Sequence, residues 1–245
     1  MIFMDFNKSE SLLTLDVDWA PDFVIDHIST MIKKFKIKTT WFITHDSPAI
    51  QRLMGESLFE VGLHPNFENN STQGNGIDNI LQNLKKIVPG AKSIRTHGLL
   101  QSTNILSKFN QYGIDVDVSL FLGKQPLLKP HYSKYFKLTR IPYFWEDDVE
   151  MEEGADWENV EKYNQISGLK IYDFHPIHIF LNSHSFAEYK KIKNMDWPNM
   201  DEAKLLSHKN ESFGTETFFK LLLESLKNKN TFTVSDISQI FNDSK

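Results

Sequence analysis

LLTLDVDWAPD (residues 12–22) is an apolar run that ends in two carboxylates, Asp16 and Asp18. Its composition predicts a β-strand, and Pro21 suits the first position of a following helix. Residues two apart in a strand share a face, so the two carboxylates would project side by side at the strand's C-terminal end. Enzymes with α/β folds place metals and water-activating bases at this position. The alternative is that Asp18 only helps to start the next helix.

Strand and helix patterns alternate after this stretch. Apolar residues at helical spacing predict a helix from Pro21 to about Phe35, and β-branched and aromatic runs predict further strands. We expect these strands at residues 38–44, 58–63, 91–96, 116–122, 138–141 and 169–174. Repeated βα units predict a parallel sheet, and the lack of a Gly-rich phosphate turn favours a barrel over an open Rossmann sheet.

Beyond residue 123 the strand–helix pattern loosens, and the acidic segment at residues 146–161 is assigned no chemistry. Residues 127–135 are predicted to be a loop, residues 146–161 a solvated acidic surface lobe, and residues 182–210 a polar insertion. A last strand at residues 231–234 would precede a terminal helix capped by Ser235.

Length and composition limit the functional classes. A chain of 245 residues fits one domain, residues 1–245, and a net charge of −5 argues against a nucleic-acid partner. With no cysteine, a transition metal must be held by histidine and carboxylate. Residues 1–8 lack a signal-peptide pattern, and no apolar run reaches about 18 residues, which predicts a cytoplasmic protein without a membrane span.

Polar residues follow several of the predicted strands. In a barrel the C-terminal ends of all strands surround one opening, so these side chains would meet in one pocket. The expected set is Asp16, Asp18, His45, His64, Arg95, His97, Asp117 and His175. Histidine and carboxylate suit zinc or another divalent first-row metal. A metal that polarises a carbonyl, a carboxylate base and an imidazole acid are together what amide hydrolysis needs.

Four motifs carry a family resemblance: LDVD (residues 15–18), GLHPNF (62–67), IRTHG (94–98) and DFHPIH (173–178). In this order they resemble the polysaccharide deacetylases, the NodB-homology carbohydrate esterases. HPNF, RTHGLLQS and FHPIHIFLN are similar, more narrowly, to the WbmS-like branch associated with bacterial surface-polysaccharide gene clusters. The resemblance implies an incomplete (β/α)7 barrel with a divalent metal, and it likens residues 232–237 to the closing strand and helix of the family.

The resemblance also implies roles for individual residues. Asp16 would be the base that deprotonates the attacking water, and His175 would be the general acid. Asp18 and His64 would be metal ligands. Arg95 would orient Asp16 through a charge-assisted hydrogen bond, unless it is an ordinary surface arginine.

The third metal ligand departs from the family pattern. The family pairs two histidines four residues apart, whereas the position four after His64 is Glu68. His97 is expected to supply the missing ligand from the neighbouring strand end, with Glu68 and Asn66 as lesser candidates. The expected ion is Zn²⁺, with Co²⁺, Ni²⁺ and Fe²⁺ as alternatives.

Other aromatic residues and histidines have weaker assignments. His178 is expected to support the site or to bind substrate. His45, Trp19 and Trp145 are candidate sugar platforms, with core packing as an equal alternative, and His27 is expected to be structural.

The predicted function is a metal-dependent hydrolase of non-peptide C–N bonds. It would remove an N-acyl group, such as acetyl, from an amino sugar during the synthesis of surface-polysaccharide (lipopolysaccharide O-antigen or capsule) precursors. The substrate would be a sugar nucleotide, a lipid-linked sugar or an oligosaccharide. Two alternatives stay open: a metal-dependent nucleotide-sugar glycosyltransferase that uses Asp-x-Asp to hold a diphosphate, and a non-catalytic sugar-binding relative.

Overall fold

Nine strands and their connecting helices make up the computed structural model, which describes residues 4–6 and 8–244. The strands are β1 Ser9–Asp16, β2 Thr39–Ile43, β3 Phe59–Leu63, β4 Ser93–Ile94, β5 Val116–Asp117, β6 His131–Ser133, β7 Leu138–Arg140, β8 Trp145–Glu146 and β9 Gly168–Phe174. The helices are α1 Asp22–Phe35, α2 Pro48–Met54, α3 Gly76–Ile87, α4 Thr103–Phe109, α5 Asp147–Glu153, α6 Glu161–Asn164, α7 Pro176–Leu181, α8 Phe186–Lys193, α9 Glu202–Leu206, α10 Thr215–Leu226 and α11 Val234–Asp243. Short 3₁₀ turns are η1 His97–Leu99, η2 Asn110–Tyr112 and η3 Trp197–Asn199.

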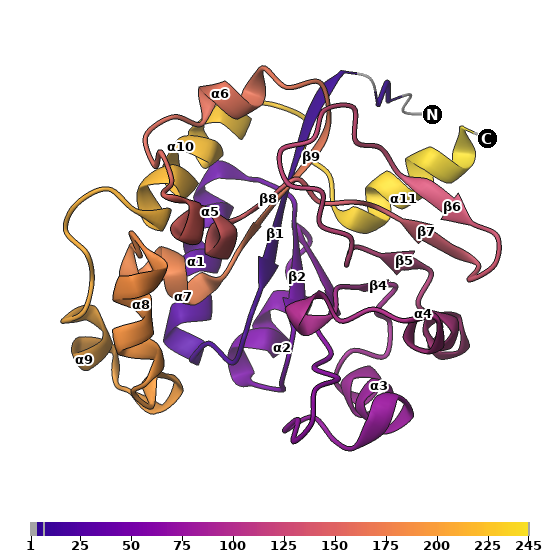
Figure 1. Cartoon of the computed structure of the whole chain (residues 1–245), viewed down its shortest axis with the longest axis horizontal. Coiled ribbons are helices and arrows are strands. Elements are labelled where there is room, and N and C mark those ends of the chain that lie inside the picture. The colour runs from indigo at the N-terminus through magenta and orange to yellow at the C-terminus, as the bar shows by residue number, and fades with distance from the viewer. Residues whose placement is uncertain (1–3, 7, 245) are drawn as a thin grey trace.

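The strands form one curled, open sheet in the order β6-β7-β5-β4-β3-β2-β1-β9-β8 (Figure 1). Every neighbouring pair is parallel except β6 with β7. The sheet is therefore a half-barrel, which confirms the predicted incomplete barrel. Because the strands are parallel, the C-terminal ends of β1, β2, β3, β4, β8 and β9 lie at the same edge.

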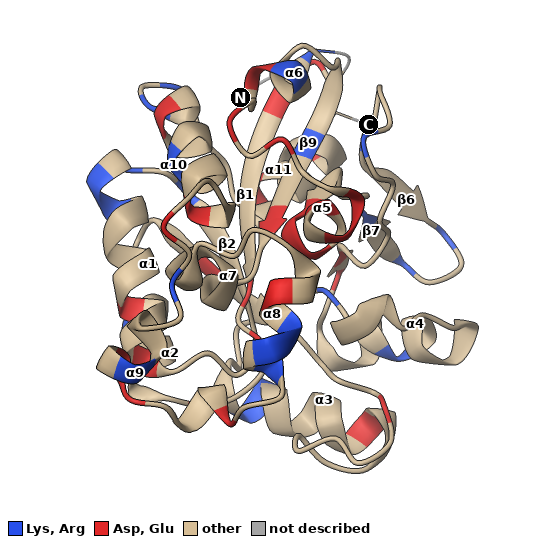
Figure 2. Cartoon of the chain, turned by 60° about the vertical axis from the view of Figure 1, so that its left-hand side comes forward, with Lys and Arg blue, Asp and Glu red and all other residues tan. Residues whose placement is uncertain are grey.

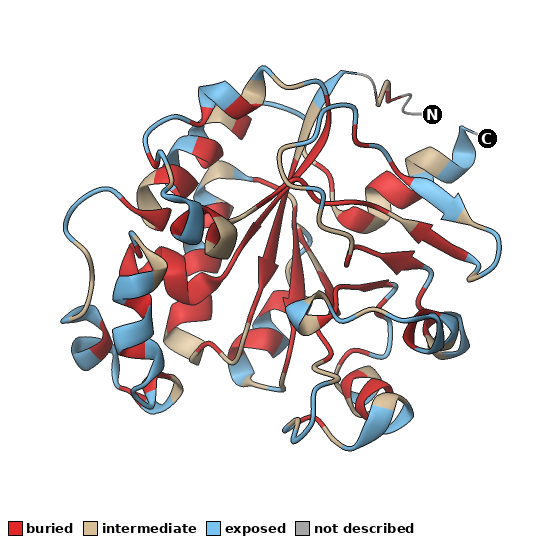
Figure 3. Cartoon of the chain, viewed as in Figure 1, coloured by how far each residue is buried: buried red, intermediate tan, exposed pale blue. Residues whose placement is uncertain are grey.

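The alternation of side chains along β1 separates two hydrophobic layers. Leu13 and Leu15 join the larger core, to which α1, α7 and α10 contribute. Leu12 points to the other face, where a smaller cluster includes Phe42 of β2 and Ile237 of α11. Because side chains alternate along a strand, Asp16, four residues after Leu12, lies on the same face of β1 as Leu12. Figure 3 shows the buried strands between these layers.

Local sequence explains the limits of the helices near the site. Helix α1 carries Asp22 in its first turn and lysines in its last, which complements the helix dipole, and it ends at Lys36 with φ 58°. Ser47 caps α2 by accepting a hydrogen bond from the backbone N–H of Ile50 at 3.3 Å. The limits of α1 confirm the helix predicted from Pro21 to about Phe35.

Several short elements differ from prediction. The strand expected at 116–122 is regular only at Val116–Asp117, and the loop expected at 127–135 contains β6. Residues 231–233 are not a strand, and the cap of α11 is Thr233 rather than Ser235. Thr233 and Asp236 form a capping box, so the chain enters the helix directly.

Two further observations concern the predicted localisation. The N-terminal stretch falls partly on residues 1–3 and 7, which lie outside the described part of the chain. Among the described helices, none combines the length and apolar character that a membrane crossing requires.

Candidate active site and metal centre

The turn after β1 brings both carboxylates to the site. The strand ends at Asp16, and Asp18 and Trp19 then adopt left-handed backbone angles, with φ 42° and 58°. Such angles are uncommon for residues other than glycine and cluster at functional sites. Asp16 Oδ2 and Asp18 Oδ1 lie 3.6 and 3.2 Å from the same atom, Nε2 of His64. The carboxylates thus converge through a turn, and the expectation that they share one strand face was wrong.

Three electron-pair donors from three strand ends meet beside this turn. Asp18 Oδ1 lies 3.2 Å from Nε2 of His64 and 3.1 Å from Nδ1 of His97, and the two imidazole nitrogens are 3.4 Å apart. Tetrahedral zinc sites with bonds of roughly 2.0–2.1 Å place their ligand atoms about 3.3 Å apart. These residues therefore fit a divalent metal ion.

The tautomer of His64 supports the same interpretation. Its Nδ1 lies 2.8 Å from the carbonyl oxygen of Arg95, which can only accept, so Nδ1 carries the proton. In the neutral ring the lone pair on Nε2 then faces the Asp18 carboxylate, an arrangement that needs a cation or a proton between them. Histidine ligands of metals characteristically donate their other N–H to a carbonyl or carboxylate in this way.

The electrostatics of the cluster favour charged forms. Burial opposes ionisation of Asp18, but the neighbouring imidazoles of His64 and His97 hold its pKa well below the ordinary value. Burial likewise opposes protonation of His97, but its hydrogen bond with Asp18 raises its pKa. The backbone N–H of His97 donates to the carbonyl of Pro65 at 3.0 Å, which fixes η1 against the loop after β3.

Arg95 is fully buried and holds Asp16. Its Nη1 donates to Asp16 Oδ1 at 3.0 Å and also to Asp173, and its Nη2 donates to Thr14 Oγ1 at 3.0 Å. The rings of Phe42 and Tyr143 lie 4.7 and 4.5 Å from the guanidinium carbon. Arg95 is therefore a structural part of the site and not a surface residue.

Gly62 of β3 makes room for one of these rings. A Cβ atom there would lie 2.8 Å from the ring of Phe42 and 2.6 Å from Ser93 Oγ. Gly62 thus leaves space for the Phe42 ring that packs against Arg95, and His64 follows two residues later, directly after β3.

Asp173 is a buried carboxylate that the sequence analysis missed. It accepts hydrogen bonds from Arg95 and, at 2.8 Å, from Thr14 Oγ1. Burial raises its pKa well above the ordinary value against the opposing charge of Arg95, and its Oδ2 has no hydrogen-bond partner among the described residues. The alternation of β9 could have identified it, because it lies two residues before His175 on a buried strand.

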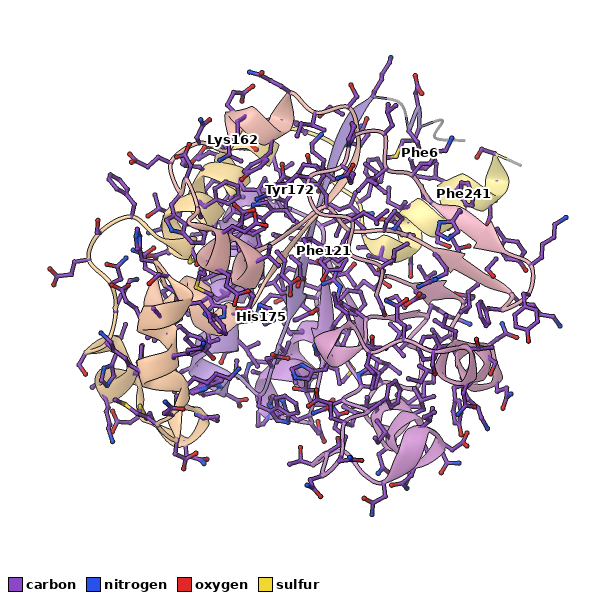
Figure 4. All side chains as sticks on the ribbon, viewed as in Figure 1. Phe6, Phe121, Lys162, Tyr172, His175 and Phe241 are labelled. Atoms are coloured by element: carbon purple, nitrogen blue, oxygen red, sulfur yellow. The ribbon has the colours of Figure 1, made fainter. Side chains whose placement is uncertain are left out.

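His175, labelled in Figure 4, follows the end of β9 and is paired with Asp147. Its Nδ1 donates to Asp147 Oδ1 at 2.7 Å, and its backbone N–H donates to Oδ2 at 2.8 Å. Its Nε2 is directed to the cluster of Asp18, His64 and His97, 3.7 Å from Asp18 Oδ2. Burial alone would lower the pKa of His175, but the charges of Asp147 and Asp148 raise it well above the ordinary value.

The prediction that residues 146–161 form a surface lobe without chemistry was wrong at its start. Asp147 is fully buried and Glu150 is 3% exposed, because this part of the segment is helix α5 packed beside β9. The missed signal was the two-residue strand β8. Asp147 follows it directly, in the position that the other polar residues occupy after their own strands.

Some expected residues are not in the cluster. Asn66 uses its side-chain oxygen to accept the backbone N–H of Glu68 at 2.9 Å, and Glu68 is exposed, so the geometry favours His97 as third ligand. His45 pairs with Thr44 at 3.0 Å, and Asp117 binds Arg140 at 2.7 Å. The expectation that His45 and Asp117 face the common pocket was therefore wrong.

The candidate aromatic platforms separate into two groups. Trp145 is 1% exposed and stacks on Phe218 with ring centroids 4.7 Å apart, so it belongs to the core. Trp19 is partly exposed and packs edge-on against His97 at 5.4 Å. Only Trp19 is at the site.

Gln73 holds the ends of β2 and β3 together. Its Nε2 donates to the carbonyls of Thr44 at 2.8 Å and His64 at 3.0 Å, while its Oε1 accepts the backbone N–H of Asn66 at 2.6 Å. The long polar loop that contains Gln73 therefore supports the position of His64.

Comparisons with known proteins agree with this geometry. The family model of WbmS-like polysaccharide deacetylases matches residues 13–193. A Bordetella bronchiseptica crystal structure, assigned as a polysaccharide deacetylase involved in O-antigen biosynthesis, is 31% identical with a TM-score of 0.81. That match covers 89% of this chain and 91% of the other. A search of curated proteins gave no match.

Two more distant structures share the fold alone. A Mycobacterium smegmatis protein assigned as a polysaccharide deacetylase is 12% identical with a TM-score of 0.54, covering 88% of this chain and 96% of the other. The 4-alpha-glucanotransferase of Thermococcus litoralis is 10% identical with a TM-score of 0.53, covering 95% of this chain and 38% of that enzyme.

With a family model that spans most of its length and a relative of similar size, this chain belongs to the WbmS-like polysaccharide deacetylases.

Proposed function

We propose that residues 1–245 form one catalytic domain, a metal-dependent deacetylase that removes an N-acyl group, such as acetyl, from an amino sugar. The substrate would be a precursor of a bacterial surface polysaccharide: a sugar nucleotide, a lipid-linked sugar or an oligosaccharide. Family membership and the O-antigen assignment of the Bordetella relative support this substrate class. The observation that carries the proposal is that Asp16 and Asp18 both approach Nε2 of His64, one beside Arg95 and the other beside His97.

Asp18, His64 and His97 would hold the metal. An oxygen and two imidazole nitrogens suit Zn²⁺, with Co²⁺, Ni²⁺ and Fe²⁺ as alternatives. When bound, the ion would polarise the amide carbonyl and stabilise the negative charge that develops on its oxygen.

Asp16 would act as the general base. Arg95 holds its Oδ1 at 3.0 Å, which leaves Oδ2 directed to the cluster side, 3.6 Å from His64 Nε2. From there Oδ2 can accept a proton as the water oxygen forms its bond to the amide carbon.

His175 would act as the general acid. Asp147 accepts the Nδ1–H and fixes the ring, so a second proton at Nε2 faces the site. Transfer of that proton to the amide nitrogen allows the C–N bond to break, and the products are a carboxylate such as acetate and the free amino sugar. The raised pKa of His175 keeps this proton available at neutral pH.

The composition of the cluster bears on the alternatives. A nucleotide-sugar glycosyltransferase would hold Mg²⁺ or Mn²⁺ largely through oxygen ligands, and two imidazoles in the cluster favour the deacetylase instead. A non-catalytic sugar-binding protein has no use for an acid–base pair on either side of a metal site. The arrangement of Asp16 and His175 around Asp18 therefore supports catalysis.

Metal analysis tests the proposal before the sugar is known. Purified protein should bind one Zn²⁺ per chain by calorimetric titration and elemental analysis, and Asp18→Asn and His64→Ala should lose it. Asp46→Asn is the matched control, since Asp46 is an exposed carboxylate after β2. Zinc binding that survives both cluster variants would overturn the assigned metal centre.

A further inference from the structure

A pocket of about 340 Å³ lies beside the proposed metal site. Its lining includes Asp18, His97 and His175 together with side chains from α5, α7, α8 and η3. Helix α8 packs against α5, and Figure 2 shows it near the strand ends that carry the site. The polar insertion after residue 182 thus contributes a wall to the site.

Asp148 of α5 is a second acidic group that lines the pocket, and His178 holds it in place. Nε2 of His178 lies 2.8 Å from Asp148 Oδ1, and Nδ1 lies 3.3 Å from Ser183 Oγ. The ring of His178 is 2% exposed and packs edge-on against Tyr189 at 4.2 Å, whereas the Asp148 carboxylate is 39% exposed. Because both nitrogens of His178 are engaged, its function is to orient Asp148, whose Oδ2 can accept hydrogen bonds from a ligand.

Aromatic faces supply the rest of a carbohydrate site. Trp19, Tyr189 and Trp197 all line the pocket, and Trp19 is held against His97. Sugars pack the C–H groups of their rings on such faces and direct their hydroxyl groups to a few fixed acceptors. A carboxylate is the strongest neutral-pH acceptor for these hydroxyls.

The volume limits what can enter. Small-molecule sites range from about 300 to 1,000 Å³, so this pocket is at the lower end. Residues from η1, α5, α8 and η3 line it, and its volume is that of a sugar unit and not of an extended polysaccharide chain.

We propose that this pocket binds one amino-sugar unit end-on, with the hydroxyl groups of the sugar donating to Asp148. The enzyme would then act on a free or terminal unit of a small precursor and not on interior units of a long chain. This inference rests on the proposed deacetylase function and specifies its substrate class.

Sugar binding can be tested without turnover. The probes are N-acetylglucosamine and its β-1,4-linked hexamer, observed by saturation-transfer NMR with zinc-loaded protein in an Asp16→Asn background. The saturation-transfer signals should be strongest for the protons of a terminal sugar unit of the hexamer. Asp148→Asn should weaken monosaccharide binding by about tenfold or more, the effect of losing a hydrogen bond to a charged group.

Matched variants separate recognition from folding. Trp197→Ala should weaken binding, whereas Trp197→Phe keeps an aromatic face and should bind nearly as the parent does. Glu152→Gln, an exposed change on the same helix as Asp148, should have no effect. Equal saturation of interior units, unchanged binding by Asp148→Asn, or no binding of either probe would overturn the proposal. Zinc content measured on the same samples tests the proposed metal centre independently.

Discussion

His97 Nδ1 lies 3.4 Å from His64 Nε2, although the two histidines are 33 residues apart and follow different strands. In the proposed metal site, His64 after β3 and His97 at the start of η1 would take the place of a histidine pair on one loop. His97→Ala should therefore weaken zinc affinity by at least about a hundredfold, since even changes behind the ligands commonly cost 10- to 100-fold. Competition titration with a zinc indicator measures this. Glu68→Ala should bind zinc normally, and the reverse pattern would show that Glu68 is the ligand.

Asp147 should matter for the chemical step and not for the metal. Asp147→Asn keeps the shape of the side chain but removes the charge that stabilises protonated His175. The deacetylation rate constant kcat should fall by about 10²–10⁴-fold, the usual contribution of a general acid. Zinc stoichiometry should be unchanged. Glu158→Gln is the control from the same acidic segment, and equal kcat values for the two variants would remove Asp147 from the mechanism.

Gln73 should be important for stability and for the position of His64. Gln73→Ala leaves two carbonyls and one backbone N–H without their partner inside the protein. Unfolding in urea should show a loss of about 1–3 kcal/mol, the cost of leaving buried polar groups unpaired. Zinc affinity should fall as well. The control is Gln165→Ala at an exposed position, and equal stability of both variants would contradict the supporting role of Gln73.

Lys170 predicts an alkaline pH dependence of stability far from the site. Burial lowers the pKa of Lys170 from 10.5 to about 8 in the folded protein. Between these values the unfolded chain binds more protons than the folded one, so this lysine makes the free energy of unfolding rise with pH. The rise is at most about 3–4 kcal/mol over the window.

Comparison of the wild type with Lys170→Met isolates this effect. The difference in urea-unfolding free energy between the two should change in favour of the wild type as pH rises from 8 to 10.5. A constant difference across that range would contradict the lowered pKa of Lys170.

The fold could be predicted where apolar residues recur at a regular spacing along the chain. The helix predicted from Pro21 to about Phe35 agrees closely with α1, and the apolar run from residue 12 lies in β1, which begins three residues earlier at Ser9. The two-residue strand β8 is too short to show any period, and it was not predicted. Its pairing depends on neighbouring strands, which local sequence does not reveal.

The site residues also fall into a predicted group and a missed group. Asp16, Asp18, His64, Arg95, His97 and His175 were all predicted from motifs at strand ends, and the structure brings them together. Asp147 was missed because β8 was missed. Asp173 was missed because it lies inside β9, whereas the search followed polar residues at strand ends. The left-handed turn at Asp18 was also unforeseen, since no glycine or asparagine marks it.

The central claim is that Asp16 removes the proton from water at a metal site that it does not itself form. The most direct test measures acetate release by zinc-loaded wild-type and Asp16→Asn proteins on a panel of N-acetylated sugar nucleotides and oligosaccharides. The account predicts release by the wild type and a rate at least about a hundredfold lower for the variant, with equal zinc content. Equal rates of acetate release by the two proteins would contradict it.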